Sequence, residues 1–429
     1  MTSDNAGHIS LWDMTAPPPP ETPPLEGAQS CDVAIVGGGF TGLSAALHLA
    51  EQGTNVIVVE AEKIGHGGSG RNAGLLNAGM WLDPEVVVER AGEEAGERIN
   101  NVFIHAPAQV LELIDRHGIE CEATRTGTLY LATSEKAKKK IAERGRQMNA
   151  RGARMEILGK EVTAEKTGTE AYHACLLDPD AGTINPMGYV RGLAHAAQKA
   201  GARIHTGTPV TGLERKGADW RVSTARGEVV APNVILATNA YTDRLWPGLS
   251  REIYPLYYFQ FATKPLSENL SKSILPERQG AWDSRKAMAS FRFDAAGRLI
   301  VGSVGSIPQG GGWLRTRWAE YKLKQLFPHL PPVEWEAQWM GRIAFTDDNL
   351  PHMHELAPGV LTCIGYNGRG IAPGTVMGKA MAHHLLGLAD DGPPLPMSDV
   401  QPAPFGRLRS AYYNIGAGVM QARQMLRKT

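Results

Sequence analysis

Three glycines and a distant glutamate are the first residues whose types and spacing suggest a chemical role. Gly37, Gly39 and Gly42 follow an apolar run at 33–36, and Glu60 ends a second apolar run about 20 residues beyond them. Glycine permits a sharp turn, a close phosphate and close helix packing, while the carboxylate accepts hydrogen bonds from ribose hydroxyls. The pattern predicts a dinucleotide site, and the lack of an arginine directly after Glu60 disfavours NADP.

A second glycine-rich segment, residues 62–81, favours a flavin dinucleotide over a nicotinamide one. Six glycines surround Ser69, Arg71 and Asn72 in this segment. Its backbone amides, hydroxyl and guanidinium can contact a pyrophosphate or the edge of a flavin. A flexible surface loop is the alternative, but the large apolar residues between the glycines are unusual for one.

A third such segment, 365–371, lies between a predicted strand at 360–364 and a predicted helix at 373–386. Reduced flavin carries negative charge near N1 and the C2 carbonyl, which a helix N-terminus and free amides stabilise. The segment therefore predicts contacts to the isoalloxazine ring. A tight packing loop is the alternative.

Several motifs resemble one family of flavoenzymes. Residues 31–80 resemble the flavin-binding start of the D-amino acid oxidase superfamily of FAD-dependent oxidoreductases, and within it the bacterial gamma-glutamylputrescine oxidase branch. The resemblance continues through GTLYLAT (127–133), LLDPDAGTINP (176–186), ATNAY (237–241), GRLIVG (297–302) and GYNGRG (365–370). Together, the glycine-rich segments and the resemblance predict FAD contacts at Gly37, Gly39, Phe40, Thr41, Gly42, Glu60, Ala61, Gly68, Ser69, Arg71, Asn72, Ala73, Gly74, Leu75, Val210, Ala237, Thr238, Asn239, Gly341, Gly365, Tyr366, Asn367, Gly368, Gly370 and Ile371.

The elements that would position these residues predict an α/β fold. Strands at 33–36 and 56–59 flank a helix, as in a Rossmann-like FAD-binding domain. Strand-forming runs at 254–263, 287–293 and 298–303 predict a second, α+β substrate domain built on a mainly antiparallel sheet. We expect the following division: 1–30, a proline-rich lead-in; 31–85, 165–245 and 340–390, the FAD-binding domain; 86–164 and 246–339, the substrate domain; 391–429, a C-terminal segment.

Aromatic residues and arginines of the second sheet are the substrate-pocket candidates. By resemblance this sheet roofs the flavin, where an apolar cage would desolvate an amine. An arginine there would bind a substrate carboxylate, although core packing and solvent-facing positions are the alternatives. The candidates are Tyr254, Tyr258, Phe291, Arg292, Trp339, Arg342 and Arg369.

The expected chemistry is oxidation of a carbon–nitrogen bond of a small amine or amino acid, with hydride transfer to flavin N5 and hydrolysis of the resulting imine. A flavin monooxygenase and a non-catalytic flavin-binding protein are the alternatives. His66 matches a position where some relatives attach flavin, but we expect non-covalent FAD. Some relatives carry a lysine that promotes reaction with oxygen. The matching strand, 299–306, has none, so oxygen and an electron carrier both remain possible acceptors.

Composition excludes several other classes of protein. The 429 residues contain 44 Lys plus Arg and 44 Asp plus Glu, so no basic face for nucleic acid is predicted. No apolar run approaches the roughly 18 residues of a transmembrane helix, and a cytoplasmic location is expected. Four scattered cysteines predict reduced core thiols and no metal site. The prolines at 16–24 predict an extended segment on the surface, with Trp12 as its anchor; a disordered tail or a ligand for a partner protein is the alternative.

Overall fold

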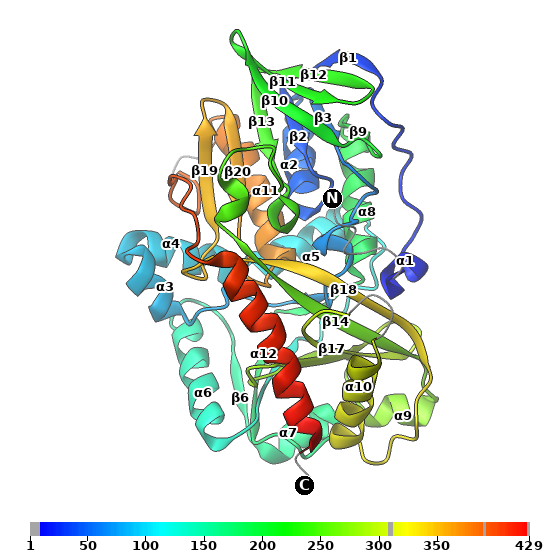
Figure 1. Ribbon diagram of the computed structural model, residues 1–429. Helices are drawn as coiled ribbons and strands as arrows, with labels where there is room; N and C mark the ends of the chain where they lie inside the picture. The colour runs from blue at the N-terminus through cyan, green and yellow to red at the C-terminus, as the bar shows by residue number, and fades with distance from the viewer. Residues whose placement is uncertain (1–8, 308–311, 389–391, 427–429) are drawn as a thin grey trace.

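A computed structural model describes residues 9–307, 312–388 and 392–426, and Figure 1 shows its two main sheets in the upper and lower halves of the molecule. Residues 1–8, 308–311, 389–391 and 427–429 lie outside the described residues, so the predicted N-terminal lead-in and C-terminal segment are described only in part. The upper sheet has the order β19-β20-β13-β2-β3-β9, with all neighbours parallel except β19 and β20. Its strands are β2 (Val33–Val36), β3 (Val56–Val59), β9 (Arg203–His205), β13 (Asn233–Leu236), β19 (His352–Ala357) and β20 (Val360–Ile364).

Three helices pack against the upper sheet and one another. They are α2 (Phe40–Glu51), α8 (Pro186–Lys199) and α11 (Ile371–Leu385). Each residue of β2 and β3 is buried, as expected for parallel strands covered on both faces. Helices α2 and α11 cross closely, because a Cβ added at Gly378 would lie 2.4 Å from the Thr41 carbonyl oxygen. The Rossmann-like half of the predicted fold is confirmed.

The lower sheet has the order β18-β14-β17-β16-β15-β5-β7-β6, in which only β15 and β5 are parallel. The predicted mainly antiparallel sheet is therefore confirmed. Its strands are β5 (Thr128–Ala132), β6 (Glu156–Leu158), β7 (Ala174–Asp178), β14 (Tyr254–Pro265), β15 (Gly280–Asp283), β16 (Ala289–Phe293), β17 (Arg298–Val304) and β18 (Trp335–Phe345). The remaining helices are α3 (Pro84–Ala91), α4 (Glu93–Ile104), α5 (Ala106–His117), α6 (Glu135–Asn149), α7 (Lys160–Thr167), α9 (Glu268–Ser273), α10 (Trp313–Leu326) and α12 (Gly406–Leu426).

Strand pairing divides the chain differently from the expected domain ranges at two places. β7 lies in a range expected to belong to the FAD-binding domain, yet it pairs with β5 and β6 in the lower sheet. β18 crosses the expected boundary at residue 340 and pairs along its length with β14. The division into domains remains a proposal.

The N-terminal segment lies against the rest of the protein and is anchored as expected. Helix α1 (Leu11–Thr15) buries Trp12 completely, and the indole Nε1 donates a hydrogen bond to the Asn72 carbonyl at 2.9 Å. The prolines that follow present their carbonyls to Arg191 and His205. β1 (Gly27–Ser30) then joins a small sheet with β10 (Val210–Lys216), β11 (Asp219–Thr224) and β12 (Gly227–Ala231).

A buried ion-pair cluster joins the start of β14, the strand β19 and the C-terminal segment. Glu252 accepts hydrogen bonds from His352 Nδ1 at 2.6 Å and His354 Nε2 at 2.8 Å, and the other His352 nitrogen faces Asp348. Burial alone would lower the pKa of His352, but its bonds to Asp348 and Glu252 outweigh burial and raise that pKa to about 9. Glu252, His352 and His354 place their donor atoms within 4.8 Å of one another, a spacing that a metal ion can also use. Here hydrogen bonds join them.

None of the helices within the described ranges combines the length and hydropathy that crossing a bilayer requires.

Candidate functional site

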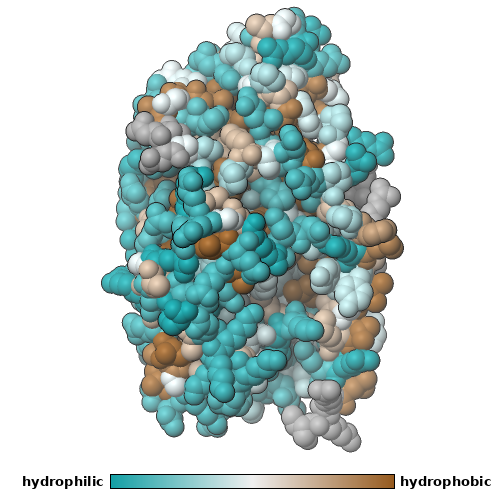
Figure 2. Space-filling view, turned by 90° about the vertical axis from the view of Figure 1, so that its left-hand side faces the viewer, coloured by the Kyte–Doolittle hydropathy of each residue, from teal (hydrophilic) through white to brown (hydrophobic). Residues whose placement is uncertain are grey.

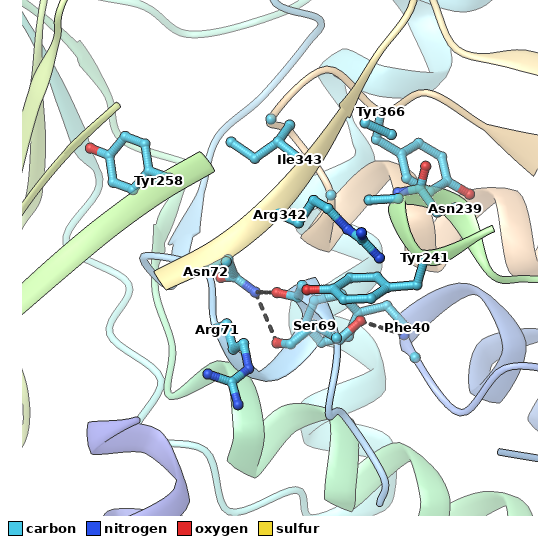
Figure 3. A pocket seen from close by; sticks show the side chains of 18 of the residues that line it. Phe40, Ser69, Arg71, Asn72, Asn239, Tyr241, Tyr258, Arg342, Ile343 and Tyr366 are labelled. Carbon is cyan, nitrogen blue, oxygen red and sulfur yellow. Dashed lines mark hydrogen bonds between the residues drawn. The ribbon is translucent and has the colours of Figure 1, made fainter. Parts of the chain in front are cut away.

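A cavity of about 990 Å³ runs from the carboxyl ends of β2 and β3 to the lower sheet. Its wall includes the N-terminus of α2, the glycine-rich loop at 65–73, strands β14 and β18, and the segment 366–371. Figure 3 shows Arg342, Tyr241, Asn239 and Tyr366 close together in the cavity, although they come from three separate segments of the chain. We describe a nucleotide end at the upper sheet and a substrate end at the lower sheet.

At the nucleotide end, Gly37 and Gly39 lie too close to other parts of the chain to carry a side chain, as the glycine pattern predicts. Gly37 has φ +116°, and a Cβ there would lie 2.8 Å from the Ala237 carbonyl oxygen. A Cβ on Gly39 would lie 2.8 Å from Ser69 Oγ, which accepts a hydrogen bond from the Phe40 amide at 3.1 Å. The start of helix α2 therefore faces the cavity with its amides, a geometry suited to a phosphate group.

Glu60 lies beside this turn at the end of β3. Its two carboxylate oxygens accept the backbone amides of Gly38 at 2.6 Å and Glu62 at 2.9 Å. Burial raises the pKa of Glu60, and the amide bonds oppose that shift. The amides fix the orientation of the carboxylate, and its remaining lone pairs can accept ribose hydroxyls.

The glycine-rich loop presents its carbonyls to large side chains from elsewhere in the chain. The Arg71 carbonyl accepts Gln260 Nε2 at 2.8 Å and Trp339 Nε1 at 3.1 Å, and Trp12 holds the next carbonyl, that of Asn72. Arg292 Nη1 donates to the Gly74 carbonyl at 2.9 Å. Four side chains thus turn the carbonyls of the loop away from the cavity.

Two of the predicted substrate-pocket residues lie behind the cavity wall and support the glycine-rich loop. Trp339 is fully buried and Arg292 is 2% exposed, and both are used in holding the loop. Burial lowers the pKa of Arg292 to about 10. Phe291 packs against Phe327 in the core below the sheet. None of these three predicted pocket residues lines the cavity.

The third glycine-rich segment closes over the start of α11. Asn367 has φ +51°, and its side-chain oxygen accepts the Thr346 amide at 3.0 Å. The Tyr366 hydroxyl lies 2.9 Å from Thr41 Oγ1, so this segment contacts the first turn of α2. Two helix N-termini are thereby held next to one cavity.

Most of the predicted cofactor contacts line this cavity, but three glycines do not: Gly42, Gly74 and Gly365. They serve close packing instead, because an added Cβ would lie 2.0 Å from the Gly37 carbonyl, 2.2 Å from the Ile184 carbonyl and 2.2 Å from Thr346 Cγ2, respectively. The predicted contacts that line the cavity are Gly37, Gly39, Phe40, Thr41, Glu60, Ala61, Gly68, Ser69, Arg71, Asn72, Ala73, Leu75, Val210, Ala237, Thr238, Asn239, Gly341, Tyr366, Asn367, Gly368, Gly370 and Ile371.

Aromatic and basic side chains form the substrate end. The candidates Tyr254, Tyr258, Arg342 and Arg369 line it, and the Tyr258 hydroxyl bonds to Ser290 Oγ at 2.7 Å. Figure 3 shows Arg342 over the ring of Tyr241, with the guanidinium carbon 4.3 Å from the ring centroid.

Arg369 is the most unusual of the basic residues that line this end. It is 7% exposed, lies 5.2 Å from the ring centroid of Trp282 and donates to the Ala78 carbonyl at 2.8 Å. Among the residues that the structure describes, no carboxylate lies within ion-pair distance of its guanidinium. Burial and the neighbouring Arg144 lower the pKa of Arg369 to about 9. Asp178 and Asp83 act on this guanidinium only from beyond ion-pair distance. A buried cation without a carboxylate in direct contact is costly, and an anionic ligand would offset that cost.

Several residues that line the substrate end are not among the predicted pocket candidates. Trp81, the stretch 282–288 with Trp282, Lys286 and Met288, and Tyr413 come from three separate segments of the chain. Trp81 and Trp282 pack together with ring centroids 5.9 Å apart, although about 200 residues separate them. No local pattern encodes such a contact. Lys286 lines the cavity, whereas Lys264 is exposed and pairs with Glu334 at 2.6 Å.

The hydrogen-bonding groups that line the cavity are suited to FAD. Close-packed glycines leave room for a pyrophosphate at the start of α2, and Glu60 offers a ribose acceptor. The segment at 366–371 and the start of α11 offer amides to an electron-rich ring. These residues would hold the dinucleotide, and the aromatic end would receive a second molecule.

Comparisons with known proteins agree with this geometry. The family described as "DAO: FAD dependent oxidoreductase" matches residues 32–384. The probable oxidoreductase OrdL of Haemophilus influenzae is 30% identical over 371 residues, 85% of each chain. Gamma-glutamylputrescine oxidoreductase of Escherichia coli is 30% identical over 398 residues, covering 90% of this chain and 92% of its own.

Solved structures share the fold. Glycine oxidase from Geobacillus kaustophilus superposes with a TM-score of 0.69 at 24% identity, covering 83% of this chain and 95% of its own. L-proline dehydrogenase from P. horikoshii gives a TM-score of 0.71 at 19% identity, covering 89% and 99%. The family that the sequence motifs predicted is confirmed: the chain belongs to the DAO family of FAD-dependent oxidoreductases and is an enzyme that uses FAD.

Proposed function

We propose that this enzyme oxidises the carbon–nitrogen bond of a small amine that also carries a carboxylate, such as an amino acid or a gamma-glutamyl amine. The observation that carries the proposal is Arg369, a buried guanidinium on the cavity wall with no carboxylate of the described chain in ion-pair contact. A substrate carboxylate would supply the missing anion through charge-assisted hydrogen bonds. The names of the relatives, gamma-glutamylputrescine oxidoreductase and glycine oxidase, support the same substrate class.

The distribution of charge along the cavity also supports a substrate that is not a bare polyamine. The strands of the lower sheet contribute aromatic, apolar and hydroxyl side chains and Arg342 to the wall, and none of their described residues there is acidic. The acidic residues of the wall are Glu60 and Glu62 at the nucleotide end and Asp243 on an exposed segment. A polycation would meet arginines without acids to balance its charge.

FAD, when bound, would supply a hydride acceptor at N5. Loss of the hydride and of the amine proton converts the substrate C–N bond into a C=N bond, which water hydrolyses. The chain's own residues contribute orientation and desolvation. Arg369 would anchor the carboxylate, while Trp282, Tyr258 and Trp81 would exclude water around the amine. An environment without acidic groups favours the neutral amine, whose lone pair assists departure of the hydride.

We also propose that FAD is bound without a covalent link. His66 lies on the cavity wall, and burial lowers the pKa of its imidazole. The wall contains no cysteine within the described ranges. Denaturation in acid is expected to release all of the yellow colour into the supernatant, and colour retained by the precipitate would contradict this proposal.

An anaerobic absorbance titration tests the function. The purified yellow enzyme would be mixed with glycine, sarcosine, proline, D- and L-amino acids, gamma-glutamylputrescine and, as the matched carboxylate-free amine, putrescine. We expect bleaching of the flavin band by a carboxylate-bearing amine and little bleaching by putrescine. Readmitting air then distinguishes reoxidation by oxygen from dependence on another electron carrier. Bound FAD that no amine bleaches would refute the proposal.

A further inference from the structure

Helix α12 places its polar side chains toward the protein. Gln421 is fully buried and donates to Ser303 Oγ at 3.0 Å and to the Val304 carbonyl at 2.9 Å. Ser410 Oγ donates to the Pro255 carbonyl at 2.5 Å, and Gln424 accepts Trp318 Nε1 at 3.3 Å. The helix is therefore attached to β14, β17 and α10 largely by hydrogen bonds.

The outward side of α12 and the residue before it are apolar. Six large side chains, between 47% and 81% exposed, follow one another at spacings of three, four or seven residues and so form one stripe. They are Phe405, Leu408, Tyr412, Ile415, Val419 and Leu426. A surface helix of a soluble monomer has the reverse arrangement, with its apolar side inward. In Figure 2, hydrophobic residues gather along the lower right-hand edge, where α12, at the front of Figure 1, is seen in profile.

The charge of this segment identifies the kind of partner. Residues 405–429 contain five basic residues, at 407, 409, 423, 427 and 428, and no aspartate or glutamate, although the whole chain has no net charge. Of the two whose side chains the structure describes, Arg409 forms an ion pair with Asp347 and Arg423 is exposed. Two copies of such a helix would bring like charges together without acids to pair with them. Anionic lipid headgroups would attract the basic residues while the apolar stripe enters the boundary of the acyl chains.

We propose that α12 docks this enzyme onto an anionic membrane surface, with the helix lying in the plane of the interface. Its six exposed apolar side chains would enter the lipid, and the polar inner side would keep the helix attached to the protein. The same helix contributes Tyr413 to the cavity wall, where it stacks on Tyr254 with ring centroids 6.1 Å apart. Docking would therefore bring one wall of the active-site cavity close to the bilayer.

Vesicle flotation with the full-length FAD-bound enzyme tests the proposal. We expect the enzyme to float with vesicles of phosphatidylcholine and phosphatidylglycerol, to float poorly with phosphatidylcholine alone, and to be released by high salt. The double variant Leu408→Glu/Ile415→Glu should bind the anionic vesicles at least about tenfold more weakly. Arg423→Gln should weaken binding about fivefold. Ile157→Glu is the matched control, because Ile157 is also exposed (48%) but lies on β6.

Flavin absorbance and circular dichroism establish that each variant is folded and loaded before flotation. Failure of the wild-type enzyme to bind anionic vesicles would overturn the proposal. Equal binding by the double variant and the control would also overturn it, because the stripe would then contribute nothing. A wild-type dimer in sedimentation velocity that becomes a monomer in the double variant, without vesicle binding by either, would identify a second copy as the partner instead.

Discussion

The two ends of the cavity are built in different ways. The nucleotide end consists mainly of backbone: the turn at Gly37, the start of α2 and the loop whose carbonyls are held by buried side chains. The substrate end consists of side chains from segments far apart in sequence, including Trp81, Trp282 and Tyr413. One end depends on conformations that few residues other than glycine can adopt, and the other depends on side-chain identity. Substitutions at the two ends should consequently fail in different ways.

The largest effect is expected at the nucleotide end. Gly37→Ala combines φ +116° with a Cβ 2.8 Å from the Ala237 carbonyl oxygen, which together cost about 2–6 kcal/mol. We expect FAD affinity to fall at least roughly 30-fold, measured by fluorescence of flavin released on dilution. Gly53→Ala is the control, because Gly53 also has a positive φ, +79°, but lies at the other end of α2 with no atom within 4 Å. Full FAD occupancy in Gly37→Ala would show that the turn tolerates a side chain.

The next effect concerns the framework behind the third glycine-rich segment. Glu252→Gln removes the buried anion shared by His352 and His354, and breaking a buried ion pair typically costs about 3–5 kcal/mol. The free energy of unfolding should fall accordingly in urea titrations. Because the pKa of His352 is raised to about 9, its stabilising contribution is complete below the unfolded value of 6.5 and is lost as pH rises through about 9. The difference between wild type and variant should shrink across that window, and a difference independent of pH would contradict this account.

The substrate end should respond in affinity and not in stability. Arg369→Gln removes the proposed carboxylate anchor, worth about 2–3 kcal/mol, so kcat/KM for carboxylate-bearing amines should fall roughly 30- to 150-fold. Stability should stay equal or rise, since burial makes this cation costly in the unliganded protein.

Binding of a short carboxylate without an amine isolates the anchor. Followed by the flavin spectrum, it should be detectable in the wild type and roughly 30- to 150-fold weaker in Arg369→Gln. Arg369→Lys keeps a charge and serves as the control, with partial loss expected because a lysine lacks the forked geometry. Unchanged binding in Arg369→Gln would exclude this residue as the anchor.

These contrasts explain how far the sequence could be used for prediction. The turn at Gly37 and the acceptor Glu60 were predictable because both are determined by about 30 consecutive residues. The roles of Arg292 and Arg369 were not, because both are buried arginines that donate hydrogen bonds to backbone carbonyls. Arg292 meets carbonyls of Gly74 and Ile184, whereas Arg369 faces the cavity, and only the tertiary structure separates these cases. The inverted polarity of α12 also appears only once its inner side is known.

The smallest effect is expected at Trp12, which anchors the N-terminal segment to the glycine-rich loop of the cavity. Trp12→Phe keeps an aromatic ring near Trp339 but loses the hydrogen bond from the indole to the Asn72 carbonyl, worth about 1 kcal/mol. FAD affinity should fall about fivefold, while KM for the amine changes little because Trp12 does not line the cavity. Trp313→Phe is the control, since Trp313 is 65% exposed and distant in sequence from the loop. A change in KM without a change in FAD affinity would mean that the glycine-rich loop positions the substrate more than the cofactor.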